Sequence, residues 1–230
     1  MTGASVERDE LPRFLVLTDR EASERAGRAL ETTVAAALDA GAPVIVLREK
    51  DLAAAERRQV GERLAALVAR AKSKLVVASD PWLAAELDAW GIHLAAADSL
   101  PDRPDRARDL AISRSCHGVA ELRAAAEQGL DWVTLSPVHL TTSKPGYGPA
   151  LGVDGLARLA NERGCPPVFA LGGIDAQRVL ACLAAGAHGV AVMGAVMGAI
   201  DPAAAAAELL AAVDAASSDH PAPISEAREP

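Results

Sequence analysis

Short apolar runs recur along the chain and alternate with longer segments of helical character. Runs of three or four residues without regular polar alternation are typical of strands that are buried on both faces, as in parallel sheets. Each run therefore predicts one strand of a parallel sheet. The eight runs are 14–17, 44–47, 75–78, 92–94, 110–112, 132–135, 168–171 and 189–192.

The segments between the runs have helical composition. Segments 21–40, 53–71 and 175–185 are rich in Ala, Leu, Glu and Arg and contain no proline, which predicts helices. Eight strand–helix units in one chain predict an α/β protein with a single (β/α)8 TIM barrel over 13–216, and a doubly wound open sheet is the alternative. The glycines expected to end helices in a left-handed C-cap are Gly41, Gly91, Gly129 and Gly186.

The two ends of the chain lack such periodicity. Residues 1–12 are mostly polar and predict a flexible N-terminus, and residues 217–230, with three prolines among polar residues, predict a disordered tail. Neither a signal peptide nor a long uncharged apolar stretch is recognisable, so we expect a cytoplasmic protein that does not cross a membrane.

Composition narrows the class of protein further. Apolar residues make up 50% of the chain but aromatic residues only 3%, so the core must consist of Ala, Val, Leu and Ile. The net charge of −8 argues against a nucleic-acid partner and requires that any bound anion be held by a local cluster of cations. The three scattered cysteines predict buried thiols rather than disulfides or a zinc site.

Polar side chains follow most of the predicted strands, where a TIM barrel collects its chemistry. The glycine-containing pairs after the last two strands offer backbone N–H groups, which suit a phosphate. The residues at these positions are Arg48, Glu49, Lys50, Ser79, Asp80, Asp98, Ser115, His117, Thr141, Thr142, Ser143, Lys144, Gly172, Gly173, Met193 and Gly194.

The loop 136–146 carries the densest polar cluster. Its hydroxyl groups can donate to phosphate oxygens, and Lys144 adds a compact positive charge, so the loop suits an oxyanion. An ordinary polar turn that ends in Pro–Gly is the alternative.

Two carboxylates, Asp80 and Asp98, are suited to Mg²⁺, which prefers oxygen ligands. Arg48, Lys50 and Lys144 would then surround a diphosphate that the ion bridges. A structural alternative exists for Asp80, which could cap a helix before a proline, and for Asp98, which could be a solvated loop acid.

The two histidines near these strand ends also admit structural roles. His117 could be satisfied by a backbone carbonyl at a helix start or take part in proton transfer. His93 lies between apolar neighbours within a strand, so we expect a hydrogen-bonded core residue.

Six motifs in this order resemble the thiamine phosphate synthase family, including its thiazole tautomerase branch, over residues 13–215. They are Leu47-Arg-Glu-Lys50, Ser79-Asp80, Ile92-His-Leu94 with Asp98, Ser115-Cys-His117, the loop from Ser136 to Lys144, and Ala170-Leu-Gly-Gly-Ile174.

The resemblance implies a transferase that couples hydroxymethylpyrimidine diphosphate to a thiazole phosphate and releases diphosphate, with Mg²⁺ as its cofactor. By this resemblance Asp80 and Asp98 bind Mg²⁺. The residues implied in catalysis are Arg48, Lys50, Lys144, Ser115 and His117. Those implied in substrate binding are the residue at position 46, Ser79, Thr141, Thr142, Ser143, Gly172, Gly173, Met193 and Gly194.

Three departures from the family pattern fall near the pyrimidine and metal sites. Val46 replaces a glutamine, Ser79 replaces an asparagine, and Ala95–Ala96 replaces Gly–Gln. A thiazole tautomerase that uses His117 for proton transfer is therefore an alternative, and a non-catalytic ligand-binding barrel is another. Because both carboxylates and all three cations are retained, we favour the synthase. We expect small-molecule substrates as partners, and the chain could form a homo-oligomer.

Overall fold

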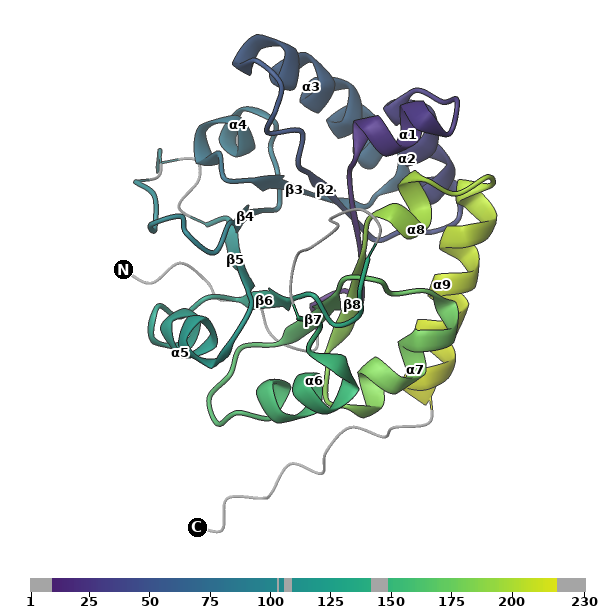
Figure 1. The fold of residues 1–230 in the computed structure, drawn as a ribbon. Helices are drawn as coiled ribbons and strands as arrows, with labels where there is room; N and C mark the ends of the chain where they lie inside the picture. The colour runs from purple at the N-terminus through teal and green to yellow at the C-terminus, as the bar shows by residue number, and fades with distance from the viewer. Residues whose placement is uncertain (1–9, 103, 106–108, 142–148, 219–230) are drawn as a thin grey trace, which may run out of the picture.

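A computed structural model describes residues 10–102, 104–105, 109–141 and 149–218 (Figure 1). Its eight parallel strands follow one another around a closed barrel in chain order, and β8 pairs with β1 to complete the ring. The strands are β1 (Phe14–Leu17), β2 (Val44–Leu47), β3 (Lys74–Ala78), β4 (Gly91–Leu94), β5 (Ala111–Cys116), β6 (Trp132–Leu135), β7 (Val168–Leu171) and β8 (Gly189–Val192). The predicted (β/α)8 TIM barrel is confirmed.

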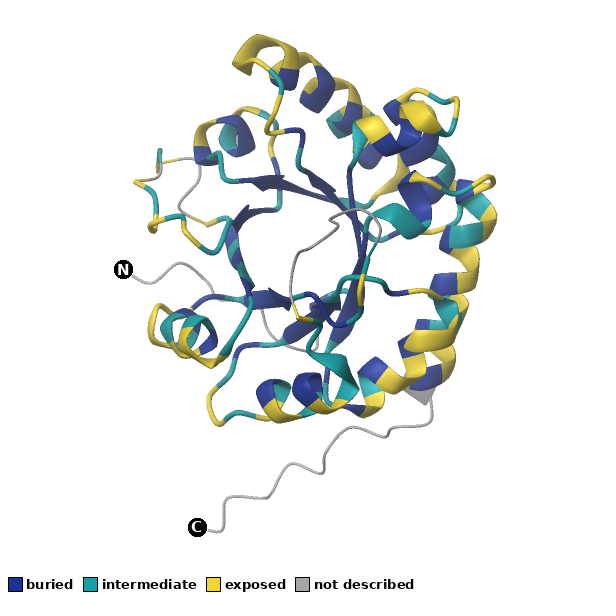
Figure 2. Cartoon of the chain, in the orientation of Figure 1, coloured by how far each residue is buried: buried dark blue, intermediate teal, exposed yellow. Residues whose placement is uncertain are grey.

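Helices surround this barrel, with buried residues toward the strands and exposed residues toward solvent (Figure 2). In the described part of the chain, β4 and β5 are joined without an α-helix. The helices are α1 (Arg20–Arg25), α2 (Leu30–Asp39), α3 (Ala54–Ala71), α4 (Pro81–Glu86), α5 (Val119–Glu127), α6 (Gly152–Ala160), α7 (Ala176–Ala184), α8 (Gly194–Met197) and α9 (Pro202–Ser218).

Several boundaries differ from the prediction. The segment 21–40 is two helices, because Gly27 has a φ of +77° after the end of α1. Strand β5 extends to Cys116, so Ser115 lies within the strand and not after it. Leu11 is buried inside the barrel although it belongs to the expected flexible N-terminus. Helix α9 continues to Ser218, two residues into the expected tail, and residues 219–230 lie outside the described residues.

The glycine prediction holds at three of the four positions. Gly41, Gly129 and Gly186 have the positive φ of a left-handed residue, as expected. Gly91 does not, and it begins β4 instead. A Cβ atom at this position would lie 2.7 Å from the carbonyl oxygen of Ala111 on β5, so close strand packing requires the glycine here.

Alternate residues of each strand face opposite sides of the barrel wall. On β1, Phe14 and Val16 pack with the helices, whereas Leu15 and Leu17 belong to the cluster inside the barrel. The N-terminal end of the interior is filled by Trp132, whose ring stacks on Trp90 at a centroid distance of 5.0 Å. The open end of the barrel is therefore the opposite one, where the strands finish.

Two further expectations can be compared with the structure. None of the helices in the described residues is long and apolar enough to cross a membrane. All three cysteines are free thiols, and two of them, Cys116 and Cys182, are buried as expected, whereas Cys165 is partly exposed. Burial raises the pKa of Cys116 to about 12, so this thiol stays protonated and unreactive.

Candidate active site

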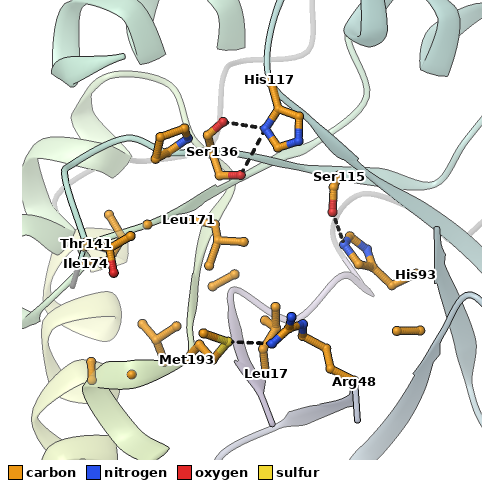
Figure 3. A pocket seen from close by; sticks show the side chains of 18 of the residues that line it. Leu17, Arg48, His93, Ser115, His117, Ser136, Thr141, Leu171, Ile174 and Met193 are labelled. Carbon is orange, nitrogen blue, oxygen red and sulfur yellow. Dashed lines mark hydrogen bonds between the residues drawn. The ribbon is translucent and has the colours of Figure 1, made fainter. Parts of the chain in front are cut away.

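A cavity of about 700 Å³ opens at the C-terminal ends of the strands (Figure 3). All of the predicted site residues on its wall come from strand ends or from the loops that follow them. They are Arg48, Lys50, Ser115, His117, Thr141, Gly172, Gly173, Met193 and Gly194. Thr142, Ser143 and Lys144 lie outside the described residues.

The segment after β2 brings two cations to this cavity, and neighbouring elements hold its backbone. The Arg48 amide donates to Thr18 Oγ1 at 2.9 Å. The buried carboxylate of Glu49 accepts hydrogen bonds from the amide of Arg20 at 3.2 and 3.3 Å. Glu49 therefore ties β2 to the start of α1, while Arg48 and Lys50 line the cavity.

The two cations have different neighbours. Arg48 Nη1 lies 2.9 Å from Met193 Sδ, so the methionine side chain covers part of the guanidinium (Figure 3). Lys50 Nζ lies 2.5 Å from Ser79 Oγ at the end of β3. The same hydroxyl donates to Asp98, which places a lysine, a serine and an aspartate in one chain of polar contacts.

Asp80 takes the helix-capping role that was the structural alternative. Its Oδ1 accepts from the amide of Leu83 at 2.9 Å and caps α4. Its Oδ2 lies 3.5 Å from Nη1 of Arg57, a buried residue of α3. Arg57 also donates to the carbonyl oxygen of Ala78 at 2.5 Å, so it holds this corner from outside the barrel.

Asp98 belongs to the loop that follows β4, and neighbouring groups hold its carboxylate in place. Burial would raise the pKa of this carboxyl group, but hydrogen bonds from Ser79 and the amide of Ala95, together with the charge of Lys50, lower its pKa overall. The guanidinium of Arg114 donates to the carbonyl oxygens of Ala96 and Asp98 and fixes the loop from behind. Asp98 is therefore ionised at neutral pH.

The two carboxylates suit Mg²⁺ by their chemistry. Mg²⁺ is usually bound through one or two carboxylates, and substrate phosphates and water complete its shell. Asp98 and Asp80 flank Ser79, although neither is part of the cavity wall itself. The described residues contain no cluster of three or more His, Cys, Asp or Glu side chains that would hold a metal alone.

The two histidines occupy different depths. His93 is almost fully buried, with 6% exposure, and its ring lies between Ser113 and Ser115. The core role expected for His93 is confirmed, but its ring also reaches the cavity floor. His117 Nδ1 lies 2.7 Å from the carbonyl oxygen of Ser136, so this nitrogen carries a proton that it donates (Figure 3).

Gly172 and Gly173, which follow β7, lie close against the loop that follows β6. A Cβ atom on Gly172 would lie 2.9 Å from Pro137 Cα, and one on Gly173 would lie 2.6 Å from the carbonyl oxygen of Leu140. Both glycines also have positive φ. The close approach of the loop after β6 thus requires glycine at both positions, which is a reason separate from the phosphate site predicted there.

The structure sets Val46 and Ser79 apart from the cavity wall. Val46 is buried inside the barrel with Leu15 and Val76, below the cavity. Leu17 and Arg178 also line the wall but were not predicted as site residues, whereas Ala95 and Ala96, which depart from the family pattern, do lie on it. Arg178 could have been found, because it lies in the first turn of the helix that follows the glycine pair.

The fold and the cavity define a (β/α)8 barrel with cationic side chains at its catalytic end. Residues 14–196 match the family described as thiamine monophosphate synthase. The chain is 37% identical over 201 residues to a putative thiamine-phosphate synthase of Geobacter sulfurreducens, covering 85% of this chain and 92% of that protein. The chain belongs to the thiamine monophosphate synthase family.

Other relatives agree with this assignment. The thiamine-phosphate synthase of Haloarcula marismortui is 38% identical over 200 residues, covering 84% of this chain and 94% of that protein. The structure of thiamine phosphate pyrophosphorylase from Pyrococcus furiosus superposes with a TM-score of 0.76 at 28% identity, covering 89% of this chain and 96% of that one.

Proposed function

We propose that this protein is a thiamine phosphate synthase, a transferase that couples hydroxymethylpyrimidine diphosphate to hydroxyethylthiazole phosphate. The bond between the pyrimidine methylene carbon and the diphosphate oxygen breaks, and diphosphate leaves with the electron pair. The thiazole nitrogen then forms a bond to that carbon. The observation that carries this proposal is the pair of cations, Arg48 and Lys50, on the cavity wall of a member of this family.

The departing diphosphate needs positive charge that is already in place. Arg48 and Lys50 supply it from β2, and the contacts of Arg48 with Met193 and of Lys50 with Ser79 limit their movement. Preorganised electrostatic contacts of this kind are typically worth about 3 kcal/mol of transition-state stabilisation. We extend the same role to Lys144, which lies outside the described residues.

Mg²⁺ is the cofactor in this proposal, with Asp80 and Asp98 as its protein ligands. When bound, the ion would neutralise charge on the diphosphate oxygens. Ser79 supports this arrangement because its hydroxyl group contacts Asp98 and Lys50. Arg57 and Arg114 hold the two acidic segments through backbone carbonyl oxygens, so the carboxylates stay in place without the ion.

The thiazole phosphate is assigned to the other side of the cavity. Thr141, Gly172 and Gly173 line this side, together with Met193 and Gly194 at the end of β8. Backbone N–H groups at such strand ends commonly bind phosphate in TIM barrels. Thr142 and Ser143 belong to the same proposed subsite by the family resemblance.

The test is coupling by the purified protein. Hydroxymethylpyrimidine diphosphate, hydroxyethylthiazole phosphate and Mg²⁺ are incubated with the protein, and thiamine phosphate is measured by chromatography. We expect product in proportion to enzyme, and none when either substrate is omitted. Binding of both substrates without product would favour the non-catalytic barrel.

A thiazole tautomerase is the second candidate, and the geometry of His117 favours it. Because Nδ1 donates to Ser136, Nε2 is the basic nitrogen of the neutral ring, as proton transfer to or from a thiazole would require. In a tautomerase, His117→Ala would abolish thiazole aromatisation by a protein that forms no thiamine phosphate. In a synthase the same change leaves most of the coupling rate.

A further inference from the structure

A row of three polar side chains crosses the barrel interior beneath the cavity. His93 on β4 contacts Ser113 through Nδ1 at 2.8 Å and Ser115 through Nε2 at 2.9 Å. His93 and Ser113 are buried, whereas Ser115 reaches the cavity wall (Figure 3). The direction of these hydrogen bonds therefore decides what Ser115 offers to a ligand.

The backbone fixes the first proton in the row. Ser113 Oγ lies 3.1 Å from the carbonyl oxygen of Ile92, which can only accept a hydrogen bond. The single hydroxyl proton of Ser113 is used in that contact. His93 Nδ1 must then be the donor toward Ser113 Oγ, since that oxygen has no second proton to give.

The remaining protons follow from the charge of the ring. Burial, with smaller effects from Lys50 and Arg48, lowers the pKa of His93 to about 3, so the imidazole is neutral and has one N–H. That proton is on Nδ1, which leaves Nε2 as an acceptor. The Ser115 hydroxyl group, 2.9 Å away, therefore donates its proton to His93 Nε2.

We infer that His93 is a positioning residue that turns the Ser115 proton inward, so that Ser115 presents acceptor lone pairs to the cavity. Such a group binds an N–H donor and repels a phosphate oxygen. For the proposed pyrimidine substrate, the matching donor is its exocyclic amino group; this identification rests on the proposed function. Ser115 is then a residue for pyrimidine recognition, whereas the family resemblance implied a part in catalysis.

One neighbouring hydroxyl group could compete for the same nitrogen. Thr134 Oγ1 lies 3.4 Å from His93 Nε2, which is long for a hydrogen bond, and the Ser115 contact is shorter by half an ångström. Thr134 therefore supplies a matched control, since it touches the same ring atom without setting the direction of the row.

The first experiment reads the tautomer directly. Nitrogen-15 NMR of histidine-labelled protein, with His93 assigned by the loss of its signals in His93→Gln, distinguishes an Nδ1–H from an Nε2–H ring. We expect the neutral Nδ1–H form between pH 5 and 8 in the wild type. We expect the Nε2–H form in Ser113→Ala, where the acceptor for Nδ1 is gone. An Nε2–H ring in the wild type would overturn the inference.

The second experiment reads the consequence for binding. Calorimetry compares hydroxymethylpyrimidine diphosphate with an analogue that has hydrogen in place of the amino group. The wild type should bind the analogue about tenfold more weakly, the size of one lost hydrogen bond, and Ser113→Ala should bind both compounds equally. Thr134→Val should keep the wild-type preference, and Ser113→Thr, which retains the hydroxyl group, should restore it.

The outcomes separate this inference from the proposed function. If Ser113→Ala weakens the binding of the substrate and of its analogue equally, or if Thr134→Val weakens binding in the same way, the row has only a structural role. If the protein binds no pyrimidine diphosphate, the proposed function fails while the NMR result still decides the tautomer.

Discussion

Lys50 Nζ and Ser79 Oγ lie 2.5 Å apart, across the ends of β2 and β3. Ser79 has a φ of +57°, an unusual conformation for a residue with a side chain, and its hydroxyl group also donates to Asp98. One residue in a strained backbone conformation thus connects a candidate diphosphate ligand with a candidate metal ligand.

Replacement of Ser79 should separate the effect of its positive φ from the effect of its hydroxyl group. Asn adopts positive φ more readily than Ser and reaches further, so Ser79→Asn should retain stability and lower the KM for the pyrimidine diphosphate. Ser79→Ala loses the hydroxyl group and should raise that KM about tenfold. Steady-state kinetics at saturating thiazole phosphate measure both. Wild-type kinetics of Ser79→Ala would mean that the hydroxyl group has no part in binding.

Removal of the Lys50 charge should slow coupling strongly. We expect Lys50→Met to lower kcat/KM roughly a hundredfold, because about 3 kcal/mol of electrostatic stabilisation of the departing diphosphate is lost. Arg70→Met removes an exposed cation from the last turn of α3 and serves as the control. A similar rate for the two variants would contradict the assignment of Lys50.

Metal removal should abolish activity, and the carboxylates should set the metal affinity. Excess chelator is expected to stop coupling until Mg²⁺ is restored. Asp80→Asn retains a residue type that caps helices, so it should keep the cap of α4 while raising the Mg²⁺ concentration for half-maximal activity more than tenfold.

Asp19→Asn makes the same change at the cap of α1 and should leave the metal requirement unchanged. Manganese binding followed by electron paramagnetic resonance measures the affinity without turnover. Wild-type affinity in Asp80→Asn would exclude Asp80 as a ligand.

His93 should make the fold sensitive to acid. Its pKa is about 3 in the native barrel and near 6.5 in an unfolded chain. Between these values only the unfolded state binds the proton, so stability falls as pH decreases, by about 1.4 kcal/mol per pH unit from this residue. Urea unfolding from pH 7 to pH 4 should show a steeper loss for the wild type than for His93→Asn. Parallel curves would refute the prediction.

A Cβ atom at Gly173 should disturb the loop after β6. Gly173→Ala combines a positive φ with a contact of 2.6 Å to the carbonyl oxygen of Leu140, so we expect a loss of several kcal/mol. At Gly164, φ is also positive but nothing lies within 4 Å of the added atom, so Gly164→Ala should cost only about 1 kcal/mol. Thermal unfolding measures the difference, which should vanish if the loop simply moves aside.

Much of the barrel could be predicted because its signals are local. Five of the eight strands begin and end as expected. Each of these strands is a short apolar run, so the run itself marks both ends. Two of the misassigned ends have identifiable causes, one local and one tertiary. Gly27 divides a segment whose composition is helical throughout, and β5 continues through Ser113 and Ser115 because polar side chains are tolerated in the barrel interior near the cavity.

The sequence by itself determined the order of strands and helices, the strand ends that line the cavity, and the family. These follow from periodicity and from residue types at fixed spacings along the chain. Only the tertiary structure decided which partner each polar group has. Arg57 forms an ion pair with Asp80. Ser113 donates its hydroxyl proton to the carbonyl oxygen of Ile92, and this contact sets which nitrogen of His93 carries the proton. Such contacts join residues from different elements, and their direction depends on distances and burial that no spacing along the chain encodes.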